Sequence, residues 1–213
     1  MKINREHIKN TFQEYTDRYD STDPKIKLKI DHTYRVADLC ERIAKSLDLA
    51  QEDIDLAWLS GMLHDIGRFE QLRRYHTFSD AQSIDHAKFA VELLYEDGLI
   101  ANYVPEISTV KITANAGTMT DGIASADNKG TADQMSGDGS STGLSEDMPL
   151  SDVFRTLRIA IGEHSAYRIQ EGLDERTQMF CHILRDADKV DIFRVICDTP
   201  MEEVYGFQTE DIL

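Results

Sequence analysis

The most informative residues of this chain are the neighbouring His64 and Asp65, within the sequence LHDIGR of residues 63–68. An imidazole and a carboxylate in an apolar segment are costly to bury unless they bind something. Other histidines and acids lie on separate apolar segments, and the full candidate set is His32, His64, Asp65, His86, His164 and Asp188. Neutral imidazole and carboxylate are suitable ligands for Mn, Fe, Co, Ni and Zn. Because helical bundles build metal sites from facing helices, this order predicts a metal centre.

The last acid of the set has two neighbours of the same type, Asp186 and Asp191. Residues two positions apart on a helix point about 200° apart, so Asp186 and Asp188 cannot both face one site. The sequence alone leaves open which of the two is the ligand.

The remaining histidines fit the metal centre less well. His7 has no partner in the pattern, and His182 lies four residues before Asp186, as in a pair on a helix surface. His76 lies in a charged connection, where we expect an exposed residue or at most a contact to substrate.

Length and composition predict one acidic domain covering residues 1–213. The chain has 23 basic and 39 acidic residues, which gives a net charge of -16. Binding to a nucleic acid polymer rewards clustered lysine and arginine, so we expect no such partner. There is no signal-peptide core and no apolar run of about 20 residues, so we expect a cytoplasmic protein without a membrane partner. The cysteines Cys40, Cys181 and Cys197 are predicted to be reduced and buried.

Hydrophobic periodicity predicts only helices, so the expected fold class is all-α. The helices are expected over residues 6–19, 24–47, 52–65, 84–95, from 150 onward, and 174–197. This assignment places His64 and Asp65 in a last helical turn, with Gly67 as the C-terminal stop. Residues 68–82 are expected to form a charged connection without helical period, and Ser83 to cap the following helix.

Residues 113–147 differ from the rest of the chain, because they are rich in glycine, serine, threonine, alanine and aspartate and contain no aromatic residue. Such a segment cannot bury enough apolar surface to offset the entropy lost on ordering. We therefore predict a low-complexity, disordered insertion.

The chain resembles the HD-domain metal-dependent phosphohydrolases. The matching motifs are HTYRVA at 32–37, LHDIGR at 63–68 and LRDADKVD at 184–191, and the resemblance covers about residues 24–198 outside the insertion. It implies an HD-type helical bundle in which one metal ion is held by His32, His64, Asp65 and Asp188.

Members of this family with two metals have extra histidines between the His-Asp pair and the final Asp. The resemblance then implies a second ion held by His86 and His164, with Asp65 bridging the two. The expected cofactor is therefore one or two divalent transition metal ions, of Mn, Fe, Co, Ni or Zn. The interval between these histidines is long, but without the insertion it suits a helix, a loop and a helix.

By the same resemblance, the expected activity is hydrolysis of a small phosphomonoester or phosphodiester, such as a nucleotide, by a metal-activated water. Asp65 would fix the ions and orient the nucleophile, and Arg68 is the best candidate for binding the phosphate. Two other functions stay open: a di-iron oxygenase of the same fold, and a non-catalytic module that binds a nucleotide or metal. The sequence does not indicate the substrate, the metal or the oligomeric state.

Overall fold

The structure is a computed structural model that describes residues 3–106 and 150–198, so the predicted insertion at 113–147 lies outside the described residues. Within these two ranges every regular element is helical, which confirms the all-α fold class. The elements are α1 (Arg5–Thr16), α2 (Pro24–Ser46), α3 (Gln51–Leu63), α4 (Ile66–Tyr75), the 3-10 turn η1 (Asp80–Gln82), α5 (His86–Val91), the π-helical turn η2 (Glu92–Glu96), α6 (Ile100–Tyr103), α7 (Leu150–Glu163) and α8 (Glu175–Asp198).

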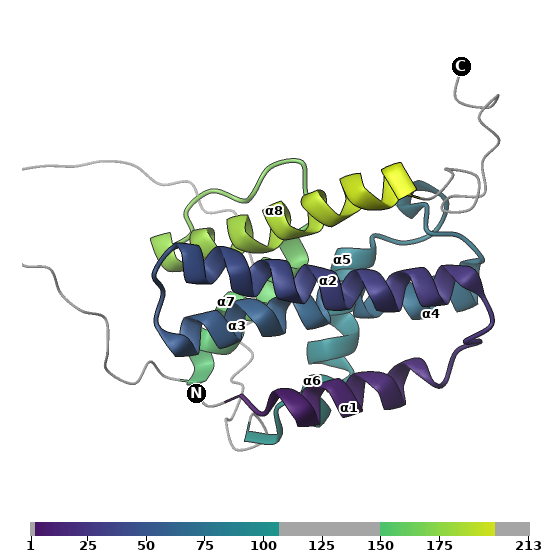
Figure 1. Cartoon of the computed structure of the whole chain (residues 1–213), viewed down its shortest axis with the longest axis horizontal. Helices are drawn as coiled ribbons and strands as arrows, with labels where there is room; N and C mark the ends of the chain where they lie inside the picture. The colour runs from purple at the N-terminus through teal and green to yellow at the C-terminus, as the bar shows by residue number, and fades with distance from the viewer. Residues whose placement is uncertain (1–2, 107–149, 199–213) are drawn as a thin grey trace, which may run out of the picture.

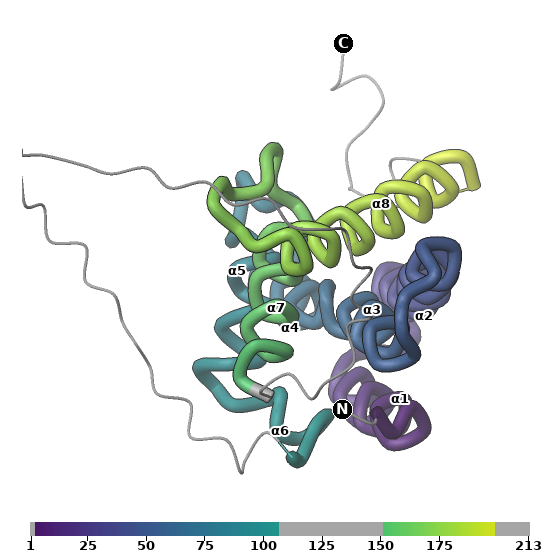
Figure 2. Tube along the Cα trace, turned by 90° about the vertical axis from the view of Figure 1, so that its left-hand side faces the viewer, coloured from purple at the N-terminus to yellow at the C-terminus, as the bar shows by residue number. Residues whose placement is uncertain are grey.

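Helix α3 packs against α2, α7 and α8, and α5 packs against α4 and α7 on the side away from α2 (Figure 2). In both views α1 lies beside α6 at the edge opposite α8 (Figure 1). The closest helix pair is α2 and α3, and Gly61 makes it possible. A Cβ added to Gly61 would lie 2.5 Å from the Cα of Ala37, so only glycine fits this crossing.

Aromatic side chains attach α1 to the bundle. The ring of Phe12 makes edge contacts with Tyr34 of α2 and Phe69 of α4, with ring centroids 5.6 and 5.9 Å apart. Such contacts add to the free energy gained by burying the rings. The hydroxyl of Tyr15 donates a hydrogen bond to the carbonyl oxygen of Ile66, 3.1 Å away, which ties α1 to the first turn of α4.

The predicted end of the helix over 52–65 is wrong, and so is the non-helical connection after it. Helix α3 ends at Leu63, His64 and Asp65 form the junction, and α4 begins at once at Ile66. Gly67 is therefore inside α4 and stops no helix. Residues 66–75 lacked a clear apolar period because α4 buries polar side chains as well, those of Glu70 and Gln71.

The helix predicted over 84–95 begins later, at His86, and its cap is Asp85 in place of Ser83. The carboxylate of Asp85 accepts hydrogen bonds from the backbone N–H groups of Ala87 and Lys88, each 3.2 Å long. This N-cap satisfies donors that a helix start leaves free. It also fixes His86 in the first turn, as the sequence indicated.

The burial of the cysteines agrees in part with the prediction. Cys40 and Cys181 are buried free thiols, as predicted, whereas Cys197 is exposed, because it lies on the outer side of the last turns of α8. Among the described residues, no helix combines the length and the apolar character that crossing a membrane requires.

Candidate metal centre

The first group of predicted ligands comes from α2, the α3–α4 junction and α8. The Nε2 atoms of His32 and His64 lie 3.3 Å apart. Oδ1 of Asp188 is 3.2 Å from Nε2 of His32 and 3.7 Å from Nε2 of His64. Oδ2 of Asp65 completes the group, at 3.6 and 3.5 Å from the same two nitrogens. All four side chains are buried.

The second group comes from the first turn of α5 and the residue after α7. The Nε2 atoms of His86 and His164 lie 3.0 Å apart. Oδ1 of Asp65 is 3.6 Å from the former and 3.7 Å from the latter. Asp65 therefore turns one oxygen toward each group, and its carboxylate connects them.

These spacings fit metal coordination. Two nitrogens that are each about 2.1 Å from one ion lie about 3.0 to 3.4 Å apart, for bond angles between octahedral and tetrahedral. Both Nε2–Nε2 distances fall in this range. Three groups of acids and histidines among the described residues could hold an ion: His32, His64 and Asp188; His64, Asp65 and His164; and Asp80, Asp85 and His86. The first two share His64, and the third shares His86 with the pair formed by His86 and His164.

The Nδ1 atom of each of the four imidazoles has a hydrogen-bond partner, on the side of the ring opposite to Nε2. Nδ1 of His64 donates to the carbonyl oxygen of Gly61, and Nδ1 of His164 to that of Ile161, both at 2.7 Å. A carbonyl oxygen only accepts, so the proton of each neutral ring is on Nδ1 and the lone pair is on Nε2. This is the tautomer that binds a metal through Nε2.

The other two imidazoles are held by carboxylates. Nδ1 of His32 lies 2.7 Å from Oδ2 of Asp191, and Nδ1 of His86 lies 2.6 Å from Oδ2 of Asp80. Pairing of a ligand histidine with a carboxylate fixes the ring and raises its basicity at the metal. Both acids are positioning residues that the ligand pattern alone did not single out.

The lone pairs give a physical reason for a cation at this place. When His86 and His164 are both neutral, two nitrogen lone pairs face each other across 3.0 Å. Such a contact is repulsive unless a proton or a metal ion lies between the nitrogens. The residues present therefore fit a divalent metal ion, independently of any family resemblance.

Burial and charge set the protonation of the site. Burial lowers the pKa of His64 to about 3 and that of His86 to about 4, so both rings are neutral near pH 7. Burial would raise the pKa of Asp65, but the charge of Lys29 is the largest opposing cause, and this pKa lies well below its ordinary value. For Asp188, burial is outweighed chiefly by the hydrogen bond to His32 and by His64, which lower its pKa. Neutral imidazoles and ionised carboxylates are the forms that bind metals.

Arg68, the predicted phosphate-binding residue, lies in the first turn of α4 beside the second group. Its Nη1 donates to Oε1 of Gln71, to the carbonyl oxygen of Phe78 and to Oδ1 of Asp80, at 2.6 to 2.8 Å. Its Nε is buried without a hydrogen-bond partner in the described residues and lies 3.7 Å from Oδ1 of Asp65. The structure thus places a free donor near the site, and the catalytic role of Arg68 stays a prediction.

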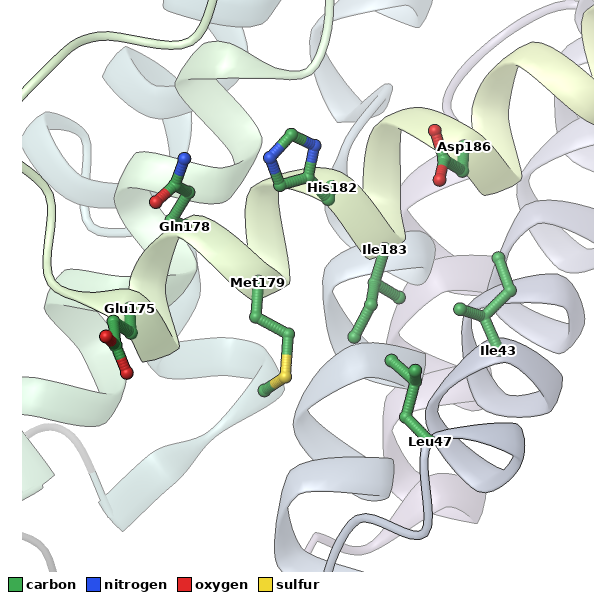
Figure 3. Close-up of a pocket in the computed structure, with 8 residues that line it drawn as sticks. All are labelled: Ile43, Leu47, Glu175, Gln178, Met179, His182, Ile183 and Asp186. Atoms are coloured by element: carbon green, nitrogen blue, oxygen red, sulfur yellow. The ribbon is translucent and has the colours of Figure 1, made fainter.

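Burial distinguishes the two acids of α8: Asp188 is 4% exposed and faces the histidines, whereas Asp186 is exposed. Asp188 is therefore the better candidate ligand. Figure 3 shows Asp186 beside a surface groove between the end of α2 and the N-terminal half of α8. The groove is lined by Ile43, Leu47, Glu175, Gln178, Met179, His182, Ile183 and Asp186. His182 also lies there, away from the candidate ligands.

The other histidines lie outside the two groups. His76 is exposed at the end of α4, as predicted, in the left-handed conformation with φ of 58°. Nε2 of His7 lies 2.8 Å from the carbonyl oxygen of Asn102.

Comparison with known families gives one result. The family model of the HD domain matches residues 30–119 of this chain. Over this stretch the chain is similar to the HD domain. The match covers the motif from His32 through the His64–Asp65 pair to His86, whereas His164 and Asp188 lie beyond it. Searches of curated proteins and of solved structures found no significant match.

Two residues of this candidate site, Lys29 and Asp80, were missed in the sequence, and Asp191 was noted there only as a neighbour of Asp188. Asp191 is three residues after Asp188, and its hydrogen bond to His32 forms only because α8 packs against α2. Nζ of Lys29 donates a hydrogen bond of 2.8 Å to Oδ2 of Asp65, which lies 36 residues later in the sequence. A weak signal existed only for Lys29, which precedes His32 by one helical turn and so shares its face.

Proposed function

We propose that this protein is a metal-dependent phosphohydrolase with two ions, held by the two groups that Asp65 connects. The observation that carries the proposal is the carboxylate of Asp65, which presents Oδ2 to His32 and His64 and Oδ1 to His86 and His164. A carboxylate that joins two sets of imidazoles is the arrangement that a two-metal hydrolytic site needs. The match of residues 30–119 to the HD-domain family model supports the same reaction class.

Divalent ions bound there would lower the pKa of bound water and neutralise charge on phosphoryl oxygens. The protein contributes the rest. Asp65 keeps the two groups at a fixed separation, while Asp80 and Asp191 hold the outer nitrogens of His86 and His32. The Nε donor of Arg68 is buried 3.7 Å from Oδ1 of Asp65 and has no hydrogen-bond partner among the described residues, so a small movement of the side chain would let it bind a phosphate oxygen there.

The charge of the chain favours a small substrate. With a net charge of -16, the protein repels long polyanions. Local cations oppose this at the site: Arg68 and Lys29 lie beside Asp65, and Nζ of Lys189 donates to Oδ2 of Asp188 at 2.9 Å. We therefore propose a small phosphomonoester or phosphodiester as the substrate class.

The test is to compare wild type with Asp65→Asn after removal of metal and reconstitution with Mn, Fe, Co, Ni or Zn. Asp186→Asn is the matched control, because it makes the same chemical change on an exposed residue of α8. We expect wild type and the control to bind up to two ions per chain and to release phosphate from nucleotides or sugar phosphates. Asp65→Asn should lose at least one ion and about a hundredfold or more in rate.

Two results would contradict the proposal. One is a wild-type protein that binds none of the five metals. The other is a metal-loaded protein that consumes oxygen with organic substrates and hydrolyses no phosphate ester, which would favour the oxygenase alternative.

A further inference from the structure

Lys29 contacts the candidate site at an unusual position. Its Nζ lies 2.8 Å from Oδ2 of Asp65, the oxygen that faces Nε2 of His32 and His64. The lysine side chain is 15% exposed and the carboxylate 3%, so this ion pair is largely shielded from water. The ammonium group therefore occupies the inner side of a carboxylate that would also bind the first metal ion.

Lys189 makes a useful comparison. It donates to Oδ2 of Asp188, whereas Oδ1 of the same carboxylate faces Nε2 of His32 at 3.2 Å. Lys189 thus binds an outer oxygen, and a metal ion at the inner oxygen does not require it to move. Lys29 shares its oxygen with the metal position, and two cations so close together in a buried site repel strongly.

Lys29 can move its ammonium group without leaving the site. A lysine ammonium sits on a flexible four-carbon stem. Nζ is 5.4 Å from the centre of the Phe78 ring, over which the guanidinium of Arg68 also lies, at 5.8 Å. The ring is thus flanked by two cations that both approach Asp65, Lys29 at Oδ2 and Arg68 at Oδ1. A short movement away from Oδ2 keeps the ammonium beside the site.

We infer that Lys29 is an exchangeable cation: it neutralises Asp65 in the metal-free protein, and in the metal-loaded enzyme it turns to bind the substrate phosphate. The inference rests on the proposed function and adds a phosphate-binding residue to it. It has a distinctive consequence. Removing the lysine should strengthen metal binding, because a competing cation is lost, and weaken phosphate binding, because a donor is lost.

The test is calorimetric titration of metal-stripped protein with Mn²⁺, followed by titration of the Mn²⁺-loaded protein with inorganic phosphate. For Lys29→Met we expect Mn²⁺ to bind about tenfold more tightly at one site. We expect phosphate to bind about tenfold more weakly. Lys29→Arg keeps the charge and should retain phosphate binding. The matched control is Lys45→Met, which removes an exposed lysine paired with Glu41 at the other end of α2.

Weaker or unchanged Mn²⁺ binding in Lys29→Met overturns the inference, since that result indicates a lysine that only supports the fold. Tighter Mn²⁺ binding with unchanged phosphate binding overturns the phosphate-binding role. Thermal melting confirms that each variant is folded, and Lys29→Gln replaces Lys29→Met if the latter is not. Failure of wild type to bind Mn²⁺ or any other of the five metals counts instead against the proposed function.

Discussion

Gly67 of α4 lies directly against the backbone of His86 in the first turn of α5. A Cβ added to Gly67 would be 2.9 Å from the carbonyl oxygen of His86 and 3.0 Å from the backbone nitrogen of Ala90. Both neighbours are backbone atoms, so the helices must move apart to admit any side chain. The glycine after the His-Asp pair therefore sets the distance between α4 and α5, and with it the place of His86 beside Asp65.

The first prediction concerns Gly67→Ala. We expect a loss of about 1 to 3 kcal/mol in the free energy of unfolding, because the added methyl group overpacks the helix contact. Metal binding by His86 and His164 should weaken more than binding by His32, His64 and Asp188. Urea unfolding and metal analysis of the purified protein measure the two effects.

The control for this prediction is Gly162→Ala in α7, where the added Cβ would lie 3.5 Å from Cγ2 of Val91, an ordinary contact. Alanine is the better helix former by about 1 kcal/mol, so the control should be neutral or more stable than wild type. If Gly67→Ala and Gly162→Ala have the same free energy of unfolding and the same metal content, the close approach of α4 and α5 does not determine the position of His86.

The second prediction separates the two positioning acids. Asp191 holds Nδ1 of His32, and Asp80 holds Nδ1 of His86. Loss of such a partner lowers metal affinity by about 10- to 100-fold. We expect Asp191→Asn to weaken the ion bound by the first group and Asp80→Asn the ion bound by the second. Two-site titration with Mn²⁺ measures both affinities; equal weakening of both sites in both variants would show that the groups do not bind separate ions.

The third prediction concerns the stability of the metal-stripped protein against pH. His64 and His86 have pKa values of about 3 and about 4 when folded, because burial disfavours the charged ring. In the unfolded chain a histidine has a pKa of about 6.5. The two neutral histidines therefore make their full contribution to the free energy of unfolding above about pH 6.5. This contribution is lost as the pH falls toward their pKa values in the folded protein.

We expect each of the two histidines to lower the free energy of unfolding by about 2 kcal/mol between pH 6.5 and pH 4.5. His32 acts in the opposite direction. Burial and the charge of Lys29 lower its pKa, but hydrogen bonds to Asp188 and Asp191 outweigh them and raise it. Its contribution is present below about pH 6.5, so it does not cancel the loss from the other two. Urea unfolding at both pH values tests this, and His86→Gln should show a smaller loss than wild type; an unchanged difference would exclude His86 as a source.

Several features could be predicted from the sequence because they depend on local chemistry. Apolar spacing along the chain predicted the helices that carry the candidate ligands. Asp23 and Pro24, which form the cap and the first turn of α2, are residue types typical of a helix start. The cost of burying His64 and Asp65 in an apolar segment indicated this pair as candidate metal ligands. The remaining histidines came from the family resemblance together with their position on apolar helices.

Other features could not be predicted from local patterns. The helix α4 was missed because its buried face includes two polar residues, Glu70 and Gln71. Glu70 accepts hydrogen bonds from Arg73 of its own helix and from Tyr19 of the segment after α1, and the acceptors of Gln71 lie after α4. Gln71, for example, donates to Asp80, Ser83 and the carbonyl oxygen of Ile84. A polar residue buried by such contacts looks exposed in a hydrophobicity pattern.

The sequence by itself determined the helical class and the set of residues that could bind a metal, because helical period and residue chemistry are properties of short segments. Only the tertiary structure decided that Asp188 and not Asp186 faces the histidines, that Asp65 divides its oxygens between two groups, and that Lys29 reaches one of them. The physical reason is that these relations depend on how α2, α4 and α8 rotate and approach one another, which is set by close contacts such as Gly61 with Ala37.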